Sequence, residues 1–543
     1  MICLGWRQFG ACYLALLATA LVPLALITYL PLDDYHNHLA RMHILARGAD
    51  DPYLSTFYQT NWQILPNLAM DLVVPWLAQI MPLEHAGRLF VGLIFLLLTT
   101  GTVALYAALH RELSWWPLLA FLFLYGRILL FGFMNYLAGV GLFLWSLAAW
   151  IYWQHRSAAF RLTIFSGLAT CLFFAHLYAL GLYAICVAGL ELGELARRAG
   201  GRRELMRRLP VALGQFVIPA LLFLSKSPTA ADSETVGYFE LGFHFWNKLR
   251  AAHQVLLSYH PAFDRLTFVA LAAGLIAALA LRWVELDRRM RLPLILLALV
   301  FLALPQAFMG GLLVDFRLPA AMVFVLVASI RPRPSGIPRA RAVALALAAL
   351  FLVRTGMIGE RWHAFDKVYD SFLEAIADLP PGRRIVAAAA GRPAAYDSTA
   401  PTLMYIGALA VIHRSAFDPA VFVNPSQQPI VAIGRYRELA ESHWWRSPPI
   451  PFGQIAPSVV DGASDEGDAR RAEDPILQYD YLLLLYPASA ANPAPDLLEP
   501  LQVDDHFHIY RIRQSESVEG GSPGSLEPGR AQLTPARGGP REG

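Results

Sequence analysis

Long apolar runs recur through most of this chain, and they restrict its fold more than any other feature. Inside a bilayer the backbone finds no water to hydrogen-bond, so apolar segments that cross it form helices. Only 16% of the residues are charged, against about 25% in soluble domains. We therefore predict a mainly α, polytopic transmembrane bundle of about eleven helices. The apolar segments lie near 11–31, 87–109, 115–131, 135–153, 161–175, 177–193, 209–225, 266–282, 292–309, 318–330 and 342–357.

The arginines predict how the bundle is oriented, because basic short loops stay on the cytoplasmic side. With Arg7 cytoplasmic, every second short loop is basic. These loops are 110–113, 154–161, 194–208, 282–291 and 331–342. The first apolar segment also resembles a signal peptide, but it is long enough to span and has no small-x-small cleavage site before Asp33. We predict an uncleaved first helix, a cytoplasmic N-terminus and a C-terminal domain on the outer side.

The chain divides into three predicted parts. Residues 1–357 form a transmembrane domain with a large first outward loop at 32–86. Residues 358–513 read as a small extracytoplasmic α/β domain, in which a helical pattern at 362–378 precedes several strand patterns. The strand patterns lie at 383–390, 479–487 and 506–513. Residues 514–543, which are rich in Gly, Ser, Pro, Glu and Arg, are predicted to be disordered.

Several function classes have no support in the sequence. Neither a GxGxxG nor a Walker phosphate loop occurs. The arginines sit in short loops between apolar segments and form no basic face for nucleic acid, so the expected partner is the lipid bilayer. All four cysteines precede the C-terminal region, which therefore has no disulfide framework.

The first outward loop carries the most distinctive polar pattern. Asp34, His38 and Arg41 share one face of a predicted amphipathic helix at the membrane surface, which begins where the first apolar segment ends. One interpretation of Asp33 and Asp34 is helix capping, because acids satisfy free N–H groups at a helix start. Two adjacent acids at a lipid–water boundary, followed closely by His36 and His38, also fit a reaction site.

This loop and the apolar segment after it resemble the GT-C superfamily of membrane glycosyltransferases, which depend on polyprenyl-phosphate sugars. The motif Asp-x-x-x-His-Leu-Ala-Arg, from Asp34 to Arg41, is most similar to a bacterial branch of that superfamily. Arg88 in HAGRLF matches a recurrent arginine at the start of the second helix. The resemblance covers roughly residues 10–190. The Asp-Glu pair of better-studied members is Asp33-Asp34 here, which leaves open which acid is catalytic.

The resemblance implies an enzyme in the bacterial inner membrane. It would move a sugar from a polyprenyl-phosphate carrier to an envelope glycan, lipid or protein acceptor on the outer face. Asp34 or Asp33 would accept the acceptor's proton, cations would bind the phosphate, and an apolar groove would hold the polyprenyl tail. The predicted substrate-binding residues are His38, Arg41, Arg88, Arg127, Asp315 and Arg317.

Other interpretations of these polar residues remain open. Asp315 and Arg317 are close enough in sequence to form a structural ion pair. Asn135 and His176 fit interhelical hydrogen bonding. The histidines near Asp33 do not complete a protein-built metal site, because neighbouring ones cannot share a helix face. A Mg²⁺ or Mn²⁺ ion bridging an acid and the donor phosphate is compatible with the pattern.

Two alternative functions remain compatible with the sequence. The first is a transporter or flippase for lipids or solutes, against which stand the absence of an inverted repeat and of charged residues in the middle of the apolar segments. The second is a catalytically inactive GT-C relative that supports envelope assembly. The asymmetric outward loop and the external domain favour an outer-surface enzyme over the transporter.

Overall fold

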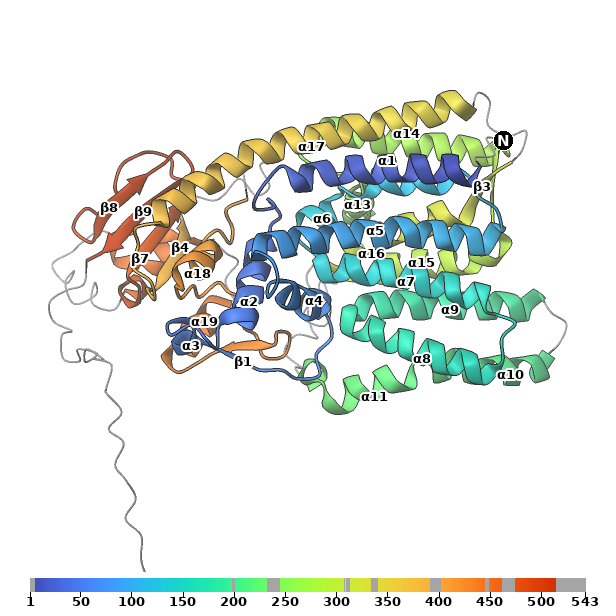
Figure 1. The fold of residues 1–543 in the computed structure, drawn as a ribbon, viewed down its shortest axis with the longest axis horizontal. Coiled ribbons are helices and arrows are strands. Elements are labelled where there is room, and N and C mark those ends of the chain that lie inside the picture. The colour runs from blue at the N-terminus through green and yellow to red at the C-terminus, as the bar shows by residue number, and fades with distance from the viewer. Residues whose placement is uncertain are drawn as a thin grey trace, which may run out of the picture.

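Helices dominate this computed structural model, which describes residues 5–197, 201–231, 245–306, 308, 313–333, 340–390, 402–444, 449–460 and 474–513. Figure 1 shows a helical bundle with a smaller α/β domain at one end. The predicted tail, 514–543, lies outside the described residues.

Seven helices are long and apolar enough to cross a membrane, and a pair bent by 42° (Met206–Gly214 and Val217–Lys226) would be an eighth. The seven are α1 (Trp6–Ala25), α5 (Leu83–His110), α7 (Met134–Tyr152), α8 (Ala158–Ala175), α9 (Leu177–Arg197), α14 (Pro261–Ala280) and α17 (Ala340–Ile376). The bent pair belongs to α10 (Gly201–Gly214) and α11 (Val217–Lys226). The protein is therefore a multi-pass membrane protein, and its mainly helical fold is confirmed.

The remaining predicted segments also fall on helices, but shorter ones. They are η1 (Trp116–Phe123), α6 (Arg127–Leu130), α15 (Arg291–Ala303) and α16 (Val314–Ser329). At about 1.5 Å per residue, α15 with its 13 residues measures roughly 20 Å, short of the ~30 Å of a bilayer core. A short pair of strands, β2 (Val284–Leu286) and β3 (Ile330–Pro332), joins antiparallel beside these helices.

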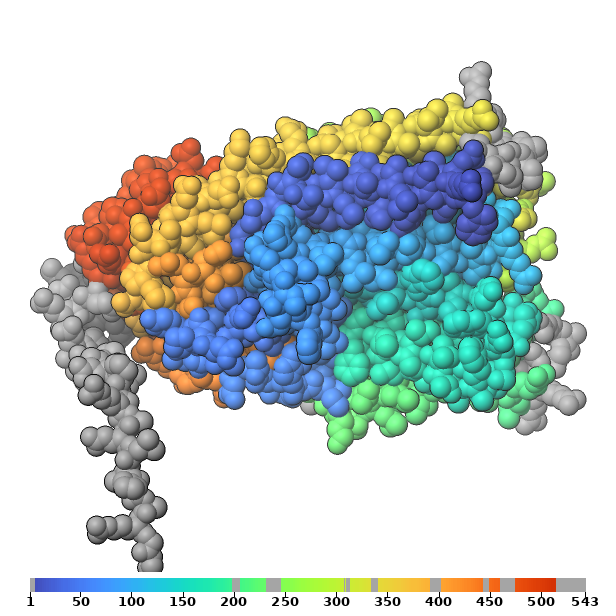
Figure 2. Space-filling model, viewed as in Figure 1, coloured from blue at the N-terminus to red at the C-terminus, as the bar shows by residue number. Residues whose placement is uncertain are grey.

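The first outward loop forms α2 (Tyr35–Arg47), α3 (Leu54–Phe57), β1 (Tyr58–Thr60) and α4 (Ala69–Leu77). The predicted helix after Asp34 is confirmed, but it does not lie open on the membrane surface. Leu39 and Met42 pack into the core of the bundle, whereas Ala40 and Ile44 pack into the core of the C-terminal domain. Figure 2 shows this early segment filling the space between the C-terminal domain and the bundle. Helix α2 thus joins the two hydrophobic cores.

The C-terminal domain is built on a five-stranded sheet of order β6-β4-β7-β9-β8. Its strands are β4 (Ile385–Ala389), β6 (Ile450–Pro451), β7 (Tyr481–Leu485), β8 (Leu498–Val503) and β9 (Phe507–Ile512). Strand β4 runs parallel to β6 and β7, and β9 is antiparallel to β7 and β8. The three predicted strands are confirmed as β4, β7 and β9. Their side chains are buried almost throughout, as expected where helices cover a sheet.

Two connections tie this domain to the rest of the chain. Helix α17 runs 37 residues without a break, so the predicted last span and the predicted helix 362–378 are one element. Figure 1 shows it extending from the bundle to the sheet. Strand β5 (Ile430–Ala432) pairs antiparallel with β1 of the first loop. Short helices complete the domain: α18 (Ala408–Arg414), α19 (Arg435–Trp444), α20 (Phe452–Ile455) and α21 (Pro457–Val460).

Candidate functional site

Asp33 and Asp34 lie in the linker between α1 and α2, which is held against the turn after α6. The Asp33 N–H donates to the Leu130 carbonyl at 2.8 Å, and the Asp34 N–H donates to the Phe131 carbonyl at 3.2 Å. Gly132 adopts φ +81°, and a Cβ there would lie 2.9 Å from the Asp34 nitrogen. A glycine is therefore needed at this position for the linker to approach so closely.

Asp34 occupies the N-cap position of α2, yet its side chain makes no capping hydrogen bond. The capping interpretation therefore does not account for its carboxyl group. Burial and the adjacent Asp33 charge raise the pKa of Asp34 to about 7, opposed by Arg317 and Arg41. A carboxyl group with a pKa this close to neutrality can exchange a proton at physiological pH.

Asp33 has different neighbours from Asp34. Burial raises its pKa, while the Arg127 guanidinium and a hydrogen bond with the Thr402 side chain act in the opposite direction. The Arg127 guanidinium lies 5.0 Å from the centre of the Phe131 ring. The two adjacent acids are thus each faced by an arginine, Arg127 for Asp33 and Arg317 for Asp34.

Arg317, in the first turn of α16, is held by aromatic side chains. Its guanidinium lies 4.0 Å from the centre of the Phe133 ring and 5.5 Å from that of Tyr178. It also lies 3.4 Å from Nε2 of His176. The Tyr136 hydroxyl donates to the Arg317 carbonyl at 2.7 Å. Such a stacked arginine is fixed in position while its charge still acts on Asp34.

An apolar cavity of about 490 Å³ opens beside Arg317, among α7, α9, α11, α15 and α16. The polar side chains that line it are those of Tyr136, Tyr178 and Arg317. The rest of its lining is apolar, including Phe173, Phe216, Phe223, Leu180 and Val300. Arg317 therefore lines the apolar cavity, and its charge also acts on the Asp34 carboxyl group.

Three predicted site residues have structural partners instead. Arg41 binds the Asp71 carboxylate through Nε at 2.6 Å and Nη2 at 3.0 Å, and both residues are almost completely buried. Arg88 donates to the Ile27 carbonyl at 2.5 Å, just beyond the end of α1. Asp315 forms its ion pair with Lys248, at 3.3 Å, rather than with Arg317. The substrate-binding roles of Arg41, Arg88 and Asp315 stay predictions, and the proposal below rests on Asp34 and Arg317.

Two histidines of α2 pack against aromatic side chains, and His36 is buried whereas His38 is half-buried. The His38 ring packs edge-on against Phe422 at 5.6 Å, and burial and Arg41 hold its pKa well below the usual range. His36 packs against Tyr369 at 4.7 Å, and burial lowers its pKa to about 3. Both rings are therefore neutral near pH 7. In the part of the chain that is described, no three His, Cys, Asp or Glu side chains form a group that could hold a metal ion.

Asn135 and His176 make hydrogen bonds between elements, as the sequence suggested. The Asn135 Oδ1 accepts from the Met70 N–H at 2.7 Å, and its amide also donates to the Asn67 carbonyl. These bonds tie the start of α4 to α7. His176 lies beside Arg317, and its ring packs against that of Tyr136 with 5.2 Å between the ring centres. It therefore borders the site through its contact with Arg317.

The C-terminal domain supplies site residues that the sequence analysis missed. Thr402 hydrogen-bonds Asp33, and Tyr405 lies close enough to both acids to feel their charges. The Tyr486 hydroxyl, at the end of β7, accepts from the Leu403 N–H at 3.0 Å. The only sequence signal for any of these was Tyr486, which ends a predicted strand. The others belong to no motif.

Comparisons with known proteins bear on the fold. No protein-family model matches the chain, and no curated protein sequence matches it. Among solved structures it resembles ArnT from Cupriavidus metallidurans bound to undecaprenyl phosphate, with 12% identity and a TM-score of 0.50 over 93% of this chain and 98% of that one. The apo state of the same protein gives 12% identity and a TM-score of 0.47 over the same shares. The first likeness shows that the chain has a membrane fold similar to that of ArnT.

Proposed function

We propose that this protein is a GT-C-type glycosyltransferase that moves a sugar from a polyprenyl-phosphate carrier to an envelope acceptor, which is a glycan, a lipid or a protein. One observation carries the proposal: Asp34 lies within the field of Arg317, and Arg317 lines an apolar cavity. A proton acceptor, a phosphate-binding cation and a place for a lipid tail are the three parts that this transfer needs.

In the proposed reaction Asp34 takes the proton of the acceptor hydroxyl as its oxygen attacks the sugar's anomeric carbon. The bond between that carbon and the phosphate oxygen breaks, and the phosphate leaves with the bonding electrons. Arg317 stabilises the charge on the leaving phosphate. The apolar cavity among α9, α11 and α15 holds the first isoprene units of the carrier. The pKa of about 7 suits Asp34 to accept and release a proton near neutrality.

Asp33 and Arg127 support this centre from the side of the C-terminal domain. The Asp33 charge raises the pKa of Asp34, which makes Asp34 a better base. Arg127 and Thr402 stabilise the Asp33 carboxylate in turn. His38, which stays neutral beside Gly132, would hydrogen-bond the sugar in this proposal.

Two further observations support the proposal. The resembled ArnT structure is bound to undecaprenyl phosphate, the class of carrier that the cavity and Arg317 would suit. The described parts of the basic loops lie at the end of the bundle away from α2 (Figure 1), which favours a cytoplasmic N-terminus and a site on the outer face of a bacterial inner membrane. A Mg²⁺ or Mn²⁺ ion between Asp34 and the donor phosphate would take most of its ligands from substrate and water.

The test compares envelope glycans and lipids of wild-type cells, deletion cells and cells that carry Asp34→Asn or Asp33→Asn at equal expression. We expect a glycan that disappears in the deletion strain and in the Asp34→Asn strain. Membranes assayed with and without EDTA test the metal. If both variants retain the wild-type glycans, the enzyme proposal fails, and the inactive scaffold or the transporter takes its place.

A further inference from the structure

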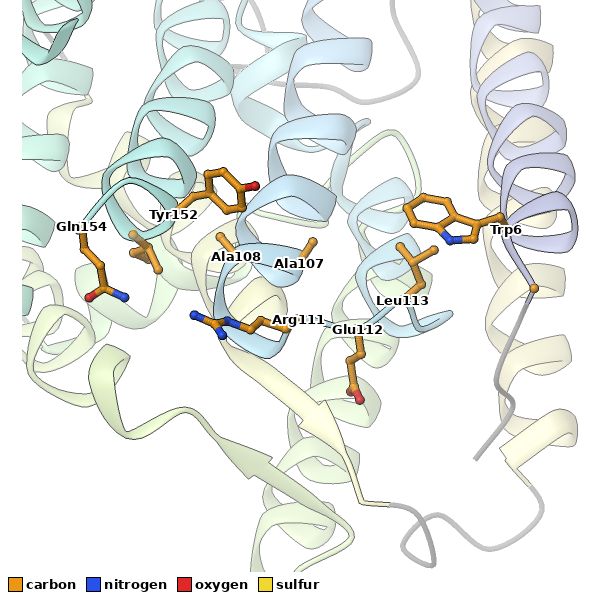
Figure 3. Close-up of a pocket in the computed structure, with 10 residues that line it drawn as sticks. Trp6, Ala107, Ala108, Arg111, Glu112, Leu113, Tyr152 and Gln154 are labelled. Carbon is orange, nitrogen blue, oxygen red and sulfur yellow. The ribbon is translucent and has the colours of Figure 1, made fainter. Parts of the chain in front are cut away.

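A second cavity lies at the end of the bundle away from Asp34, with a volume of about 660 Å³. It is bounded by the start of α1 and the ends of α5 and α7, whose opposite ends face the outward loop. Figure 3 shows Trp6 and Tyr152 on either side of Ala107 and Ala108. Pockets that bind small molecules have volumes of about 300–1,000 Å³, so this one has room for a ligand.

Arg111 is the cation of this cavity. Among the described residues its guanidinium has no hydrogen-bond or ion-pair partner, whereas nearby Arg289 and Arg331 are paired with Asp287 and Glu285. The backbone of Arg111 has φ 55°, in the left-handed conformation that glycine usually supplies at the end of a helix. An arginine is thus present where its backbone conformation is unfavourable.

Glu112 also lines the cavity, but in the described part of the chain no ion pair joins it to Arg111. Figure 3 shows Arg111 extending toward Gln154, while Glu112 points in a different direction. The Glu112 carboxylate accepts a hydrogen bond from the Tyr106 hydroxyl at 3.0 Å. The cavity therefore offers a guanidinium and an amide to a ligand with anionic oxygen atoms.

The surroundings of the cavity place it at the lipid–water boundary. Trp6 is 78% exposed and Tyr152 is 73% exposed, and both belong to helices that are long and apolar enough to span. Exposed Trp and Tyr side chains at the ends of spanning helices occupy the headgroup region. Ala107 and Ala108 provide a floor of small apolar side chains along which an acyl chain can run.

We propose that this cavity binds an anionic phospholipid of the phosphatidylglycerol type in the leaflet opposite the C-terminal domain. The Arg111 guanidinium would bind the phosphate, Gln154 would hydrogen-bond the headgroup, and the acyl chains would follow α5 between α1 and α7. Arginine side chains at this depth attract anionic headgroups. The site is independent of the proposed sugar transfer.

The test is native mass spectrometry of the full-length protein in detergent, with added phosphatidylglycerol, phosphatidylethanolamine or phosphatidylcholine. We expect the wild type to retain one phosphatidylglycerol in preference to the other two. Arg111→Gln should weaken that binding about tenfold, because a charge-assisted hydrogen bond is lost. Ala108→Trp, which fills the floor, should weaken it comparably.

Arg156→Gln is the matched control. Arg156 is exposed at the same end of the bundle, stacks on Phe160 at 5.9 Å and does not line the cavity, so its loss should leave binding unchanged. Thermal unfolding of each variant shows whether it is folded. Inorganic phosphate should not compete with the lipid at equal concentration, because it lacks the acyl chains. Equal retention of the three lipids, or wild-type binding by both Arg111→Gln and Ala108→Trp, would overturn the proposal.

Discussion

The Thr402 side chain lies beside the Asp33 carboxyl group and lowers its pKa through a hydrogen bond, although the two residues are far apart in the sequence. Thr402 is itself held in place, because the Tyr369 hydroxyl of α17 donates to its carbonyl at 3.0 Å. The next residue, Leu403, donates its N–H to the Tyr486 hydroxyl at 3.0 Å. The C-terminal domain therefore forms part of the wall around the two acids.

Replacing Thr402 by valine should lower kcat about tenfold, because Asp33 would lose a hydrogen bond to its charged form. KM for the carrier should change little, since Thr402 lies on the side of Asp33 and not at the apolar cavity. Thr402→Ser keeps the hydroxyl and should restore most of the activity. Initial rates in purified membranes measure all three. A valine variant with unchanged kcat would remove Thr402 from the site.

Asp34→Asn should reduce the rate of transfer by at least about a hundredfold, since a general base contributes that much or more. The amide is nearly isosteric, so the variant should fold and insert normally. Asp33→Asn should cost less, because Asp33 acts through its charge on Asp34. Matched rates for both variants would show that the two acids share one role. Activity at the wild-type level in Asp34→Asn would exclude Asp34 as the base.

The pH dependence of transfer should reflect the pKa of about 7 at Asp34. A base acts in its deprotonated form, so activity should rise with pH through about 7 and fall about tenfold per pH unit below it. In Asp33→Asn the neighbouring charge is gone, and the acidic limb of the residual activity should move to lower pH. A rate profile with the same acidic limb in both proteins would contradict the assigned coupling.

Arg317→Gln should lower kcat about a hundredfold, because it removes the cation beside the leaving phosphate. Lysine keeps the charge but loses the flat guanidinium that stacks on Phe133, so Arg317→Lys should recover only part of the activity. Arg435→Gln serves as the control, since Arg435 is exposed on the C-terminal domain and stacks on its neighbour Tyr436. An equal loss in the control would indicate a general defect instead.

The Arg41–Asp71 pair should contribute to stability rather than to catalysis. Removing one member leaves a buried charge without its partner, so Asp71→Asn should destabilise the fold by about 3–5 kcal/mol. Arg41→Met combined with Asp71→Leu should recover much of that loss. Thermal unfolding in detergent measures each step. A double variant less stable than Asp71→Asn would show that the pair is needed for more than charge compensation.

The helices and strands that show a local pattern of apolar residues could be predicted from the sequence. The contacts between residues far apart in the sequence could not. Long apolar runs predicted the helices, and short strand patterns predicted β4, β7 and β9. The partner of Arg41 is Asp71, which lies 30 positions away in α4. No sequence motif predicts that α4 packs beside α2. Likewise, Thr402 and Tyr405 belong to no recognisable pattern and reach the acids only through tertiary folding. Asp34 could be proposed from the sequence because it lies where the first apolar segment ends and the next helix begins.

The long helix α17 has a consequence for how the protein matures in the cell. Thr402, Tyr405 and Tyr486 are synthesised after α17, and therefore after the other membrane helices have left the ribosome. The wall beside Asp33 can close only when these residues have been synthesised and β5, which also follows α17, has paired with β1. A chain truncated after α17 would thus occupy the membrane with both acids present but without a complete site, and under the proposed function it would turn over no carrier.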